Sequence, residues 1–187
     1  ENLMAQALQG TSKYVEAYEV LNNIYRPTID QQKALQQLSF YLGVKEYNKQ
    51  DYEQSIYYLM SCKRYPINEV YSYLSRFWLA DCYFQLNDFE RSIDIYSEIS
   101  VVTNVNIKDY EVLKKYNLAY SYFQKADYSN AINSFRSYEK VAKDSMRLHD
   151  SYLRIADSYF MRSDFDLSEK YYDKAIEYQP DNEEIYN

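Results

Sequence analysis

The sequence has 187 residues and a net charge of -7, and its 2 Gly and 3 Pro exclude a glycine-rich phosphate loop. So few turn-forming residues also disfavour a β-sandwich or barrel. The 47% hydrophobic content includes 25 Tyr, which is enough apolar surface for a folded core. An acidic chain lacks the clustered Lys and Arg that nucleic-acid binding needs, and no apolar run is long enough to cross a bilayer. We therefore expect neither a nucleic-acid partner nor a membrane span.

Five segments of the chain repeat one pattern in order. They align on an aromatic residue at spacings of 38, 37, 39 and 37 residues, at Tyr14, Tyr52, Phe89, Tyr128 and Phe165. A small residue lies nine positions before each aromatic and another lies three positions after it. Apolar residues between them recur every three or four positions, which is the spacing of one helical face. Each segment therefore predicts two antiparallel helices, A and B, that pack through their small residues.

The predicted units form a single array over 1–187. Their approximate bounds are 1–29, 30–67, 68–105, 106–143 and 144–180, and residues 181–187 begin a further helix. The first unit keeps only part of helix A, at 1–9, so we expect both ends to have been cut from a longer array.

An aspartate precedes the anchoring aromatic of each later unit and is expected to cap helix B. These residues are Asp51, Asp88, Asp127 and Asp164. Each carboxylate is placed to accept from an unpaired N–H of the first helical turn. Asp51 followed by Gln54 also fits a reciprocal capping box. A metal-binding row is excluded, because the repeat spacing sets these carboxylates about a helix diameter apart.

The repeated pattern resembles the tetratricopeptide repeat family. The matching residues are Leu42-Gly43, Leu118-Ala119 with Tyr122, Ala131 with Phe135, and Ser168, Tyr172, Ala175 and Pro180. This resemblance implies an all-α fold, a right-handed α-solenoid superhelix of about five helix-turn-helix hairpins. The units here exceed the family's usual length of about 34 residues. The excess is expected to add one N-terminal turn to helix A, at 30–33, 68–71 and 144–147.

No catalytic or metal-binding constellation emerges from the sequence. The single histidine, His149, is expected to be a solvated surface residue without a nucleophile or zinc-binding cysteines beside it. Cys62 and Cys82 are interpreted as small buried helix residues, and a disulfide between them is the alternative. We predict no enzyme, no metal and no cofactor.

The family resemblance also implies a ligand surface along helix A. In the family, positions i, i+4 and i+7 of this helix line a concave groove. Carried onto this sequence, the lining residues are Phe40, Val44, Tyr47, Phe77, Asp81, Phe84, Tyr116, Tyr120, Phe123, Leu153, Asp157 and Phe160. The stripe is largely aromatic and holds two carboxylates but no cation. It therefore predicts a neutral or basic ligand and argues against the acidic tail that chaperone-binding members hold.

The predicted function is a non-catalytic scaffold that holds a peptide segment or helix of an unidentified partner protein in this groove. In the alternative, the rings only pack between helices and the chain is a structural spacer within a larger cell-envelope repeat protein. The Tyr-rich units are similar to long repeat proteins exported by Bacteroidota-type bacteria, which favours an exported or periplasmic location over a cytoplasmic one. Self-association through the end of the array is a third alternative.

Overall fold

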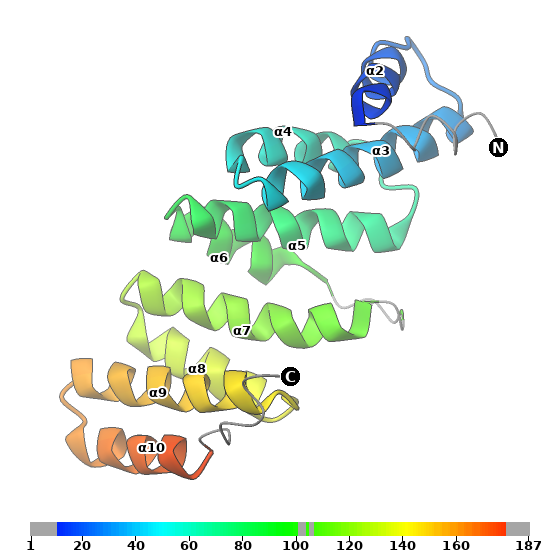
Figure 1. The fold of residues 1–187 in the computed structure, drawn as a ribbon. Helices are drawn as coiled ribbons and strands as arrows, with labels where there is room; N and C mark the ends of the chain where they lie inside the picture. The colour runs from blue at the N-terminus through cyan, green and yellow to red at the C-terminus, as the bar shows by residue number, and fades with distance from the viewer. Residues whose placement is uncertain (1–10, 101–103, 105–106, 179–187) are drawn as a thin grey trace. The chain divides into compact units, whose positions relative to one another are not determined.

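The computed structural model describes residues 11–100, 104 and 107–178 (Figure 1). Those residues contain nine α-helices and no strands, which confirms the all-α prediction. The helices are α2 (Thr11–Asn22), α3 (Ile29–Asn48), α4 (Tyr52–Lys63), α5 (Glu69–Gln85), α6 (Phe89–Glu98), α7 (Lys108–Gln124), α8 (Tyr128–Glu139), α9 (Ser145–Met161) and α10 (Phe165–Glu177). The helices expected at 1–9 and 181–187 lie outside the described residues.

Long helices alternate with short ones from α3 onward. The long helix α3 has 20 residues, and α5, α7 and α9 have 17 each. The short helices α4, α6, α8 and α10 have 12, 10, 12 and 13 residues. Helices α3, α5 and α9 begin at or within one residue of the segments expected to supply an extra turn. The lengthened helix A is therefore confirmed for these three helices.

Each long helix ends in a tight turn that passes through the left-handed backbone region. The residues with positive φ are Gln50, Asn87, Ala126 and Ser163, with φ between 61° and 64°. The backbone N–H of the next residue then donates to a carbonyl five positions earlier, as in the 2.9 Å bond from Asp127 to Tyr122. This pattern satisfies the last carbonyls of the helix and reverses the chain within two residues.

The aspartates that follow these turns cap the short helices in part as predicted. Asp51 and Asp127 each accept from the backbone N–H three residues later, at 3.1 and 3.2 Å. Asp164 occupies the same position, but its side chain makes no cap hydrogen bond. Its carboxylate instead lies 3.4 Å from Nε of Arg162. The cap prediction is therefore wrong for Asp164.

The reciprocal capping box expected at Asp51 is also only half formed. The backbone N–H of Asp51 already donates to the carbonyl of Glu46 at 3.0 Å, so it offers no donor to the side chain of Gln54. A complete capping box occurs at the start of α3 instead. There Thr28 Oγ1 accepts from the N–H of Gln31, whose side chain accepts from the N–H of Thr28.

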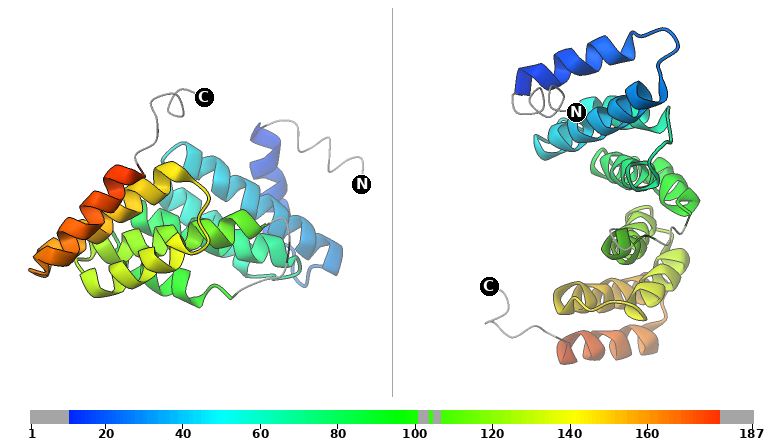
Figure 2. Two further views of the ribbon diagram at one scale, coloured as in Figure 1. Left: turned by 90° about the horizontal axis from the view of Figure 1, so that it is seen from below. Right: turned by 90° about the vertical axis from the view of Figure 1, so that its right-hand side faces the viewer.

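The described residues fall into two compact units. Unit 1 holds residues 11–88 with 98–100, 104 and 107, and unit 2 holds residues 89–97 and 108–178. Within unit 1, α4 packs against both α3 and α5. Within unit 2, α8 packs against α7 and α9, and α9 pairs with α10. The pairing of α9 and α10, coloured yellow to red, is visible in both views of Figure 2.

Small residues bring the helices of unit 1 close together. Gly43 of α3 faces the fully buried Leu59 of α4. Ser55 of α4 donates its hydroxyl to the carbonyl of Gly43 at 2.8 Å, so the helix contact is also hydrogen-bonded. Cys62 and Cys82 are buried and free, which confirms the first interpretation and contradicts the disulfide alternative. Burial raises the pKa of both thiols to about 11, so they are poor nucleophiles.

The core of unit 2 is built from the same small-residue columns. Ala119, Ala131 and Ala156 are fully buried, and Ser168 of α10 donates to the carbonyl of Ala156 at 3.0 Å. His149 is half-buried between α9 and α10, where its Nδ1 lies 2.8 Å from the carbonyl oxygen of Ala175. The expectation of a solvated histidine is therefore wrong. This histidine is held by backbone.

Candidate functional site

In unit 1, the expected ligand-binding stripe runs along α3 and α5. Phe40 and Val44 are half-buried, and the ring of Phe40 lies 5.2 Å from that of Tyr71. The hydroxyl of Tyr47 donates to the carboxylate of Asp81. Burial and this contact with Asp81 raise the pKa of Tyr47 strongly. The side chains of this stripe are therefore tied to one another between neighbouring long helices.

Two phenylalanines of the unit 1 stripe differ in accessibility. Phe84 is half-buried, but Phe77 is only 2% exposed, with its ring edge-on to Trp78 at 5.8 Å. A side chain this deeply buried is not available to a ligand. The assignment of Phe77 to the binding stripe is therefore wrong. Trp78, the next residue along α5, is half-buried instead, and its ring lies 4.8 Å from that of Tyr47.

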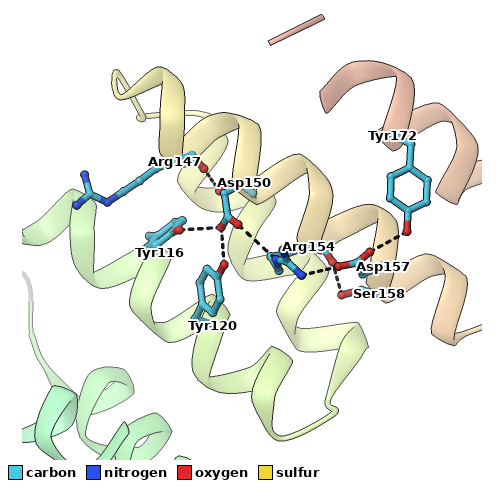
Figure 3. A network of polar contacts seen from close by, with 9 residues as sticks. Tyr116, Tyr120, Arg147, Asp150, Arg154, Asp157, Ser158 and Tyr172 are labelled. Carbon is cyan, nitrogen blue, oxygen red and sulfur yellow. Dashed lines mark hydrogen bonds and ion pairs between the residues drawn. The ribbon is translucent and has the colours of Figure 1, made fainter. Parts of the chain in front are cut away.

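In unit 2, the stripe is organised around one carboxylate. Asp150 of α9 accepts hydrogen bonds from the hydroxyls of Tyr116 and Tyr120 of α7, at 2.7 and 2.6 Å (Figure 3). Its other oxygen lies 3.3 Å from Nε of Arg154, one turn further along α9. A carboxylate with three donors is well satisfied although water still reaches it, since 25% of its side chain is exposed.

Arg154 connects this carboxylate to a second one. Its Nη1 lies 2.6 Å from Asp157, whose other oxygen accepts from the hydroxyl of Tyr172 of α10 at 2.7 Å (Figure 3). Asp157 was expected to attract a neutral or basic ligand. Arg154 lies between the two carboxylates, so it offsets only one of their two charges and weakens that preference without removing it. We call the connected set Tyr116, Tyr120, Asp150, Arg154, Asp157 and Tyr172 the tyrosine–aspartate network.

The network changes the acidity of its tyrosines. Burial, followed by the contacts with Asp150, raises the pKa of Tyr120 to about 12 and that of Tyr116 further. The hydrogen bond to Asp157 raises the pKa of Tyr172 as well. All three hydroxyls therefore stay protonated near pH 7 and act as hydrogen-bond donors.

The remaining stripe residues of unit 2 range from packed to exposed. Leu153 is half-buried and packs against the core of the unit. Phe123 lies beneath the guanidinium of Arg154, 5.5 Å from the ring centroid, in a cation–π contact. Phe160 is 55% exposed, and its ring lies 5.5 Å from that of Phe165. Phe160 is thus the most accessible ring of this stripe.

Asp150 and Arg154 are the residues that sequence reasoning missed. They belong to an i, i+4, i+7 series with Asp157, which has the spacing of the predicted stripe but starts three residues before Leu153. The charge alternation along this series was a usable signal for ion pairs on one helical face. The link to Tyr116 and Tyr120 carries no such signal, because those tyrosines lie 34 and 30 residues earlier in the chain.

Among the residues that the structure describes, no group of three or more His, Cys, Asp and Glu side chains is placed to hold a metal ion. Over the same residues, no helix has both the length and the apolar character needed to cross a membrane.

Comparison with known families identifies tetratricopeptide repeats in this sequence. One tetratricopeptide repeat model matches residues 115–144 and 149–182, and another matches residues 74–100. The two matches of the first model include most of α7 and α9 and all of α8 and α10, so every residue of the tyrosine–aspartate network lies within them. No curated protein matches the chain.

Proposed function

Because this chain is a tetratricopeptide repeat protein, and such repeats are generally protein-interaction scaffolds, we propose that it binds a peptide segment or helix of a partner protein along its long helices. The proposed binding role is non-catalytic. In unit 2 the proposed contact residues are Tyr116, Tyr120, Phe123, Leu153, Asp157 and Phe160, joined by Arg154. In unit 1 they are Phe40, Val44, Tyr47, Asp81 and Phe84.

The observation that carries this proposal is the exposed pair of rings at the end of the unit 2 stripe. Phe160 and Phe165 are 55% and 58% exposed and contact each other, and the neighbouring Met161 is 58% exposed. Large aromatic and thioether side chains give much contact area at an interface. Phenylalanine and methionine are both enriched at protein–protein interfaces relative to the rest of the surface.

The tyrosine–aspartate network supports binding by fixing the surface beside this pair. Asp150 holds Tyr120 through its hydroxyl, and Arg154 covers Phe123. Side chains that are already ordered lose less conformational freedom when a ligand arrives. Because Asp150 and Asp157 already bond to Arg154 and to tyrosine hydroxyls, we expect the ligand to contribute mainly neutral apolar side chains.

The same network also favours the alternative function, a structural spacer within a larger cell-envelope repeat protein. The hydroxyls of Tyr116, Tyr120 and Tyr172 all bond to carboxylates within unit 2. Polar groups satisfied in this way stabilise helix packing without needing a ligand. A spacer would use the rings for packing alone and would leave Phe160 exposed beside Phe165.

Selection of a random peptide library displayed on phage separates the two functions. For a scaffold, we expect enriched peptides with apolar side chains, and we expect Phe123→Ala with Phe160→Ala to weaken them at least about tenfold. Ile176→Ala, at a 69% exposed residue of α10, is the control and should leave affinity unchanged. Circular dichroism checks that helicity is kept. Unchanged affinity in the double variant would overturn the stripe assignment, and a library without enrichment would favour the spacer.

A further inference from the structure

A second surface of unit 2 lies at the end of the α7–α8 hairpin opposite the turn at Ala126. A cavity of about 520 Å³ is present there. Pockets of about 300–1,000 Å³ are typical of ligand sites. Its apolar lining includes Val112 and Leu113 of α7, with Tyr138 and Val141 at the end of α8. The cavity therefore has room and apolar surface for a large side chain.

The charged groups around this cavity are not balanced. Asp144 pairs with Arg147, and one oxygen of Glu111 lies 3.2 Å from Nζ of Lys114, which is outside the lining. These pairs offset both charges, although the other oxygen of Glu111 is buried and accepts no hydrogen bond. The remaining charges of the lining are three lysines against one aspartate, at Lys108, Lys115, Lys143 and Asp109.

The three lysines that line the cavity leave it with an excess of positive charge. Lys115 donates to the hydroxyl of Ser137 at 3.2 Å, which orients its ammonium group without neutralising it. Asp109 lies in the first turn of α7, where a carboxylate also offsets the positive end of the helix dipole. The chain as a whole carries a net charge of -7, so a local positive excess beside an apolar surface is a specific feature.

We propose that this cavity binds an acidic peptide segment of a partner protein, with one large apolar side chain on its lining and carboxylates against Lys115 and Lys143. Charge complementarity selects the acidic groups, and the apolar lining selects the side chain. A nucleic acid fits poorly, because its phosphates would meet an apolar lining on a chain of net negative charge.

The cavity adjoins the stripe of unit 2 but draws on different residues. The guanidinium of Arg147, which lines the cavity, lies 5.9 Å from the centroid of the Tyr116 ring. A peptide that follows the stripe to Tyr116 would therefore reach the cavity with its next residues. The inference goes beyond the proposed function, because it adds a preference for acidic side chains in the ligand, which the stripe alone does not select.

Fluorescence anisotropy with a defined peptide set tests the proposal. The probes are peptides enriched from the phage library, together with copies in which every Asp and Glu is replaced by Asn and Gln. We expect the acidic peptides to bind wild type, and Lys115→Glu with Lys143→Glu to weaken binding by about tenfold or more. Their affinity should also fall as salt rises from about 0.05 to 0.5 M, because partly exposed charges are screened.

A matched charge change separates the cavity from the net charge of the chain. Lys170→Glu on α10 makes the same change of charge per site at an exposed lysine outside the cavity, and it should leave affinity unchanged. Lys143→Gln alone tests the charge with the least disturbance, and circular dichroism checks folding of all variants.

Three results would overturn the cavity assignment. They are selected peptides without acidic residues, equal affinity for the amide copies, and unchanged binding to the double lysine variant. The stripe variant Phe123→Ala with Phe160→Ala is measured in parallel. If that variant alone loses binding, the stripe function stands and the cavity proposal falls. If sedimentation shows a dimer that the lysine variants dissociate, the occupant is a second copy of the chain and the peptide proposal is wrong.

Discussion

Replacement of Asp150 by asparagine should destabilise unit 2 more than any other single change in the network. The carboxylate accepts from Tyr116, Tyr120 and Arg154. An asparagine has one acceptor oxygen and one NH₂ group, so it presents a donor either to the two hydroxyls or to the guanidinium. At least one hydrogen bond to a charged group is lost in either orientation, and the substituted side chain then faces an unpaired donor.

The magnitude follows from the bonds lost and from their exposure. A hydrogen bond to a charged group contributes about 1.5–3 kcal/mol, and an unpaired buried donor costs about 1–3 kcal/mol. The side chains of Asp150 and Arg154 are 25% and 29% exposed, so water replaces part of what is lost. We therefore expect the free energy of unfolding to fall by about 2 kcal/mol, toward the low end of those ranges.

Urea unfolding followed by circular dichroism measures this loss. Asp173→Asn, at an exposed carboxylate of α10, is the matched control and should change stability by less than about 0.5 kcal/mol. Tyr120→Phe adds a second test, because it should cost less in the Asp150→Asn background than in wild type. If the two changes add within about 0.5 kcal/mol, the hydroxyl and the carboxylate are not coupled and the reasoning fails.

Three further predictions concern the fold and its titration. A Cβ added at Gly43 would lie 2.6 Å from Cγ of Leu59. This clash outweighs the gain in helix propensity, so Gly43→Ala should lower the free energy of unfolding by about 1–2 kcal/mol. The loss should be smaller in a Leu59→Ala background. Ala126 has φ 62°, so Ala126→Gly should stabilise by about 0.5–1 kcal/mol in urea unfolding, whereas Ala126→Val should destabilise. The raised pKa of Tyr120, about 12 against about 10 when unfolded, means that the unfolded chain loses this proton first. The contribution of Tyr120 to stability should therefore be constant below about pH 10 and fall between about pH 10 and 12, as the difference in stability between wild type and Tyr120→Phe shows. Tyrosinate absorbance should also rise later in the folded chain than in urea, and coincident titration curves would contradict this.

The helices and their packing were predictable because their signals are local and repeated. The small residues Gly43 and Ala119 lie at helix contacts where the repeat places them, and both are buried. The aspartate before each short helix also follows from one rule of helix capping, which holds at Asp51 and Asp127. It fails at Asp164 because a nearby arginine competes for the carboxylate. Such competition depends on side-chain rotamers that the repeat pattern does not specify.

The depth of the stripe residues was less predictable than their helical position. Phe77 and Tyr116 share one repeat position, but the phenylalanine is buried and the tyrosine is half-buried. A phenylalanine has no polar atom that must reach a partner, so its depth follows the space around it, and Phe40 at the same repeat position is only half-buried. The hydroxyl of Tyr116 instead bonds to Asp150 on the next long helix. Repeat alignment assigns a face to both residues, and only the partner on the next helix decides their exposure.

The tyrosine hydroxyls of the network donate to groups within unit 2, and this limits what a ligand of unit 2 can recognise. The hydroxyl of each of these tyrosines donates to an aspartate, at Tyr116, Tyr120 and Tyr172. Both aspartates also accept from Arg154. A ligand that competed for these groups would have to break charge-assisted bonds before making its own. Ring faces and the exposed Phe160 remain available without that cost. Recognition along the stripe is therefore expected to depend on apolar shape, and charge selectivity is left to the lysines of the neighbouring cavity.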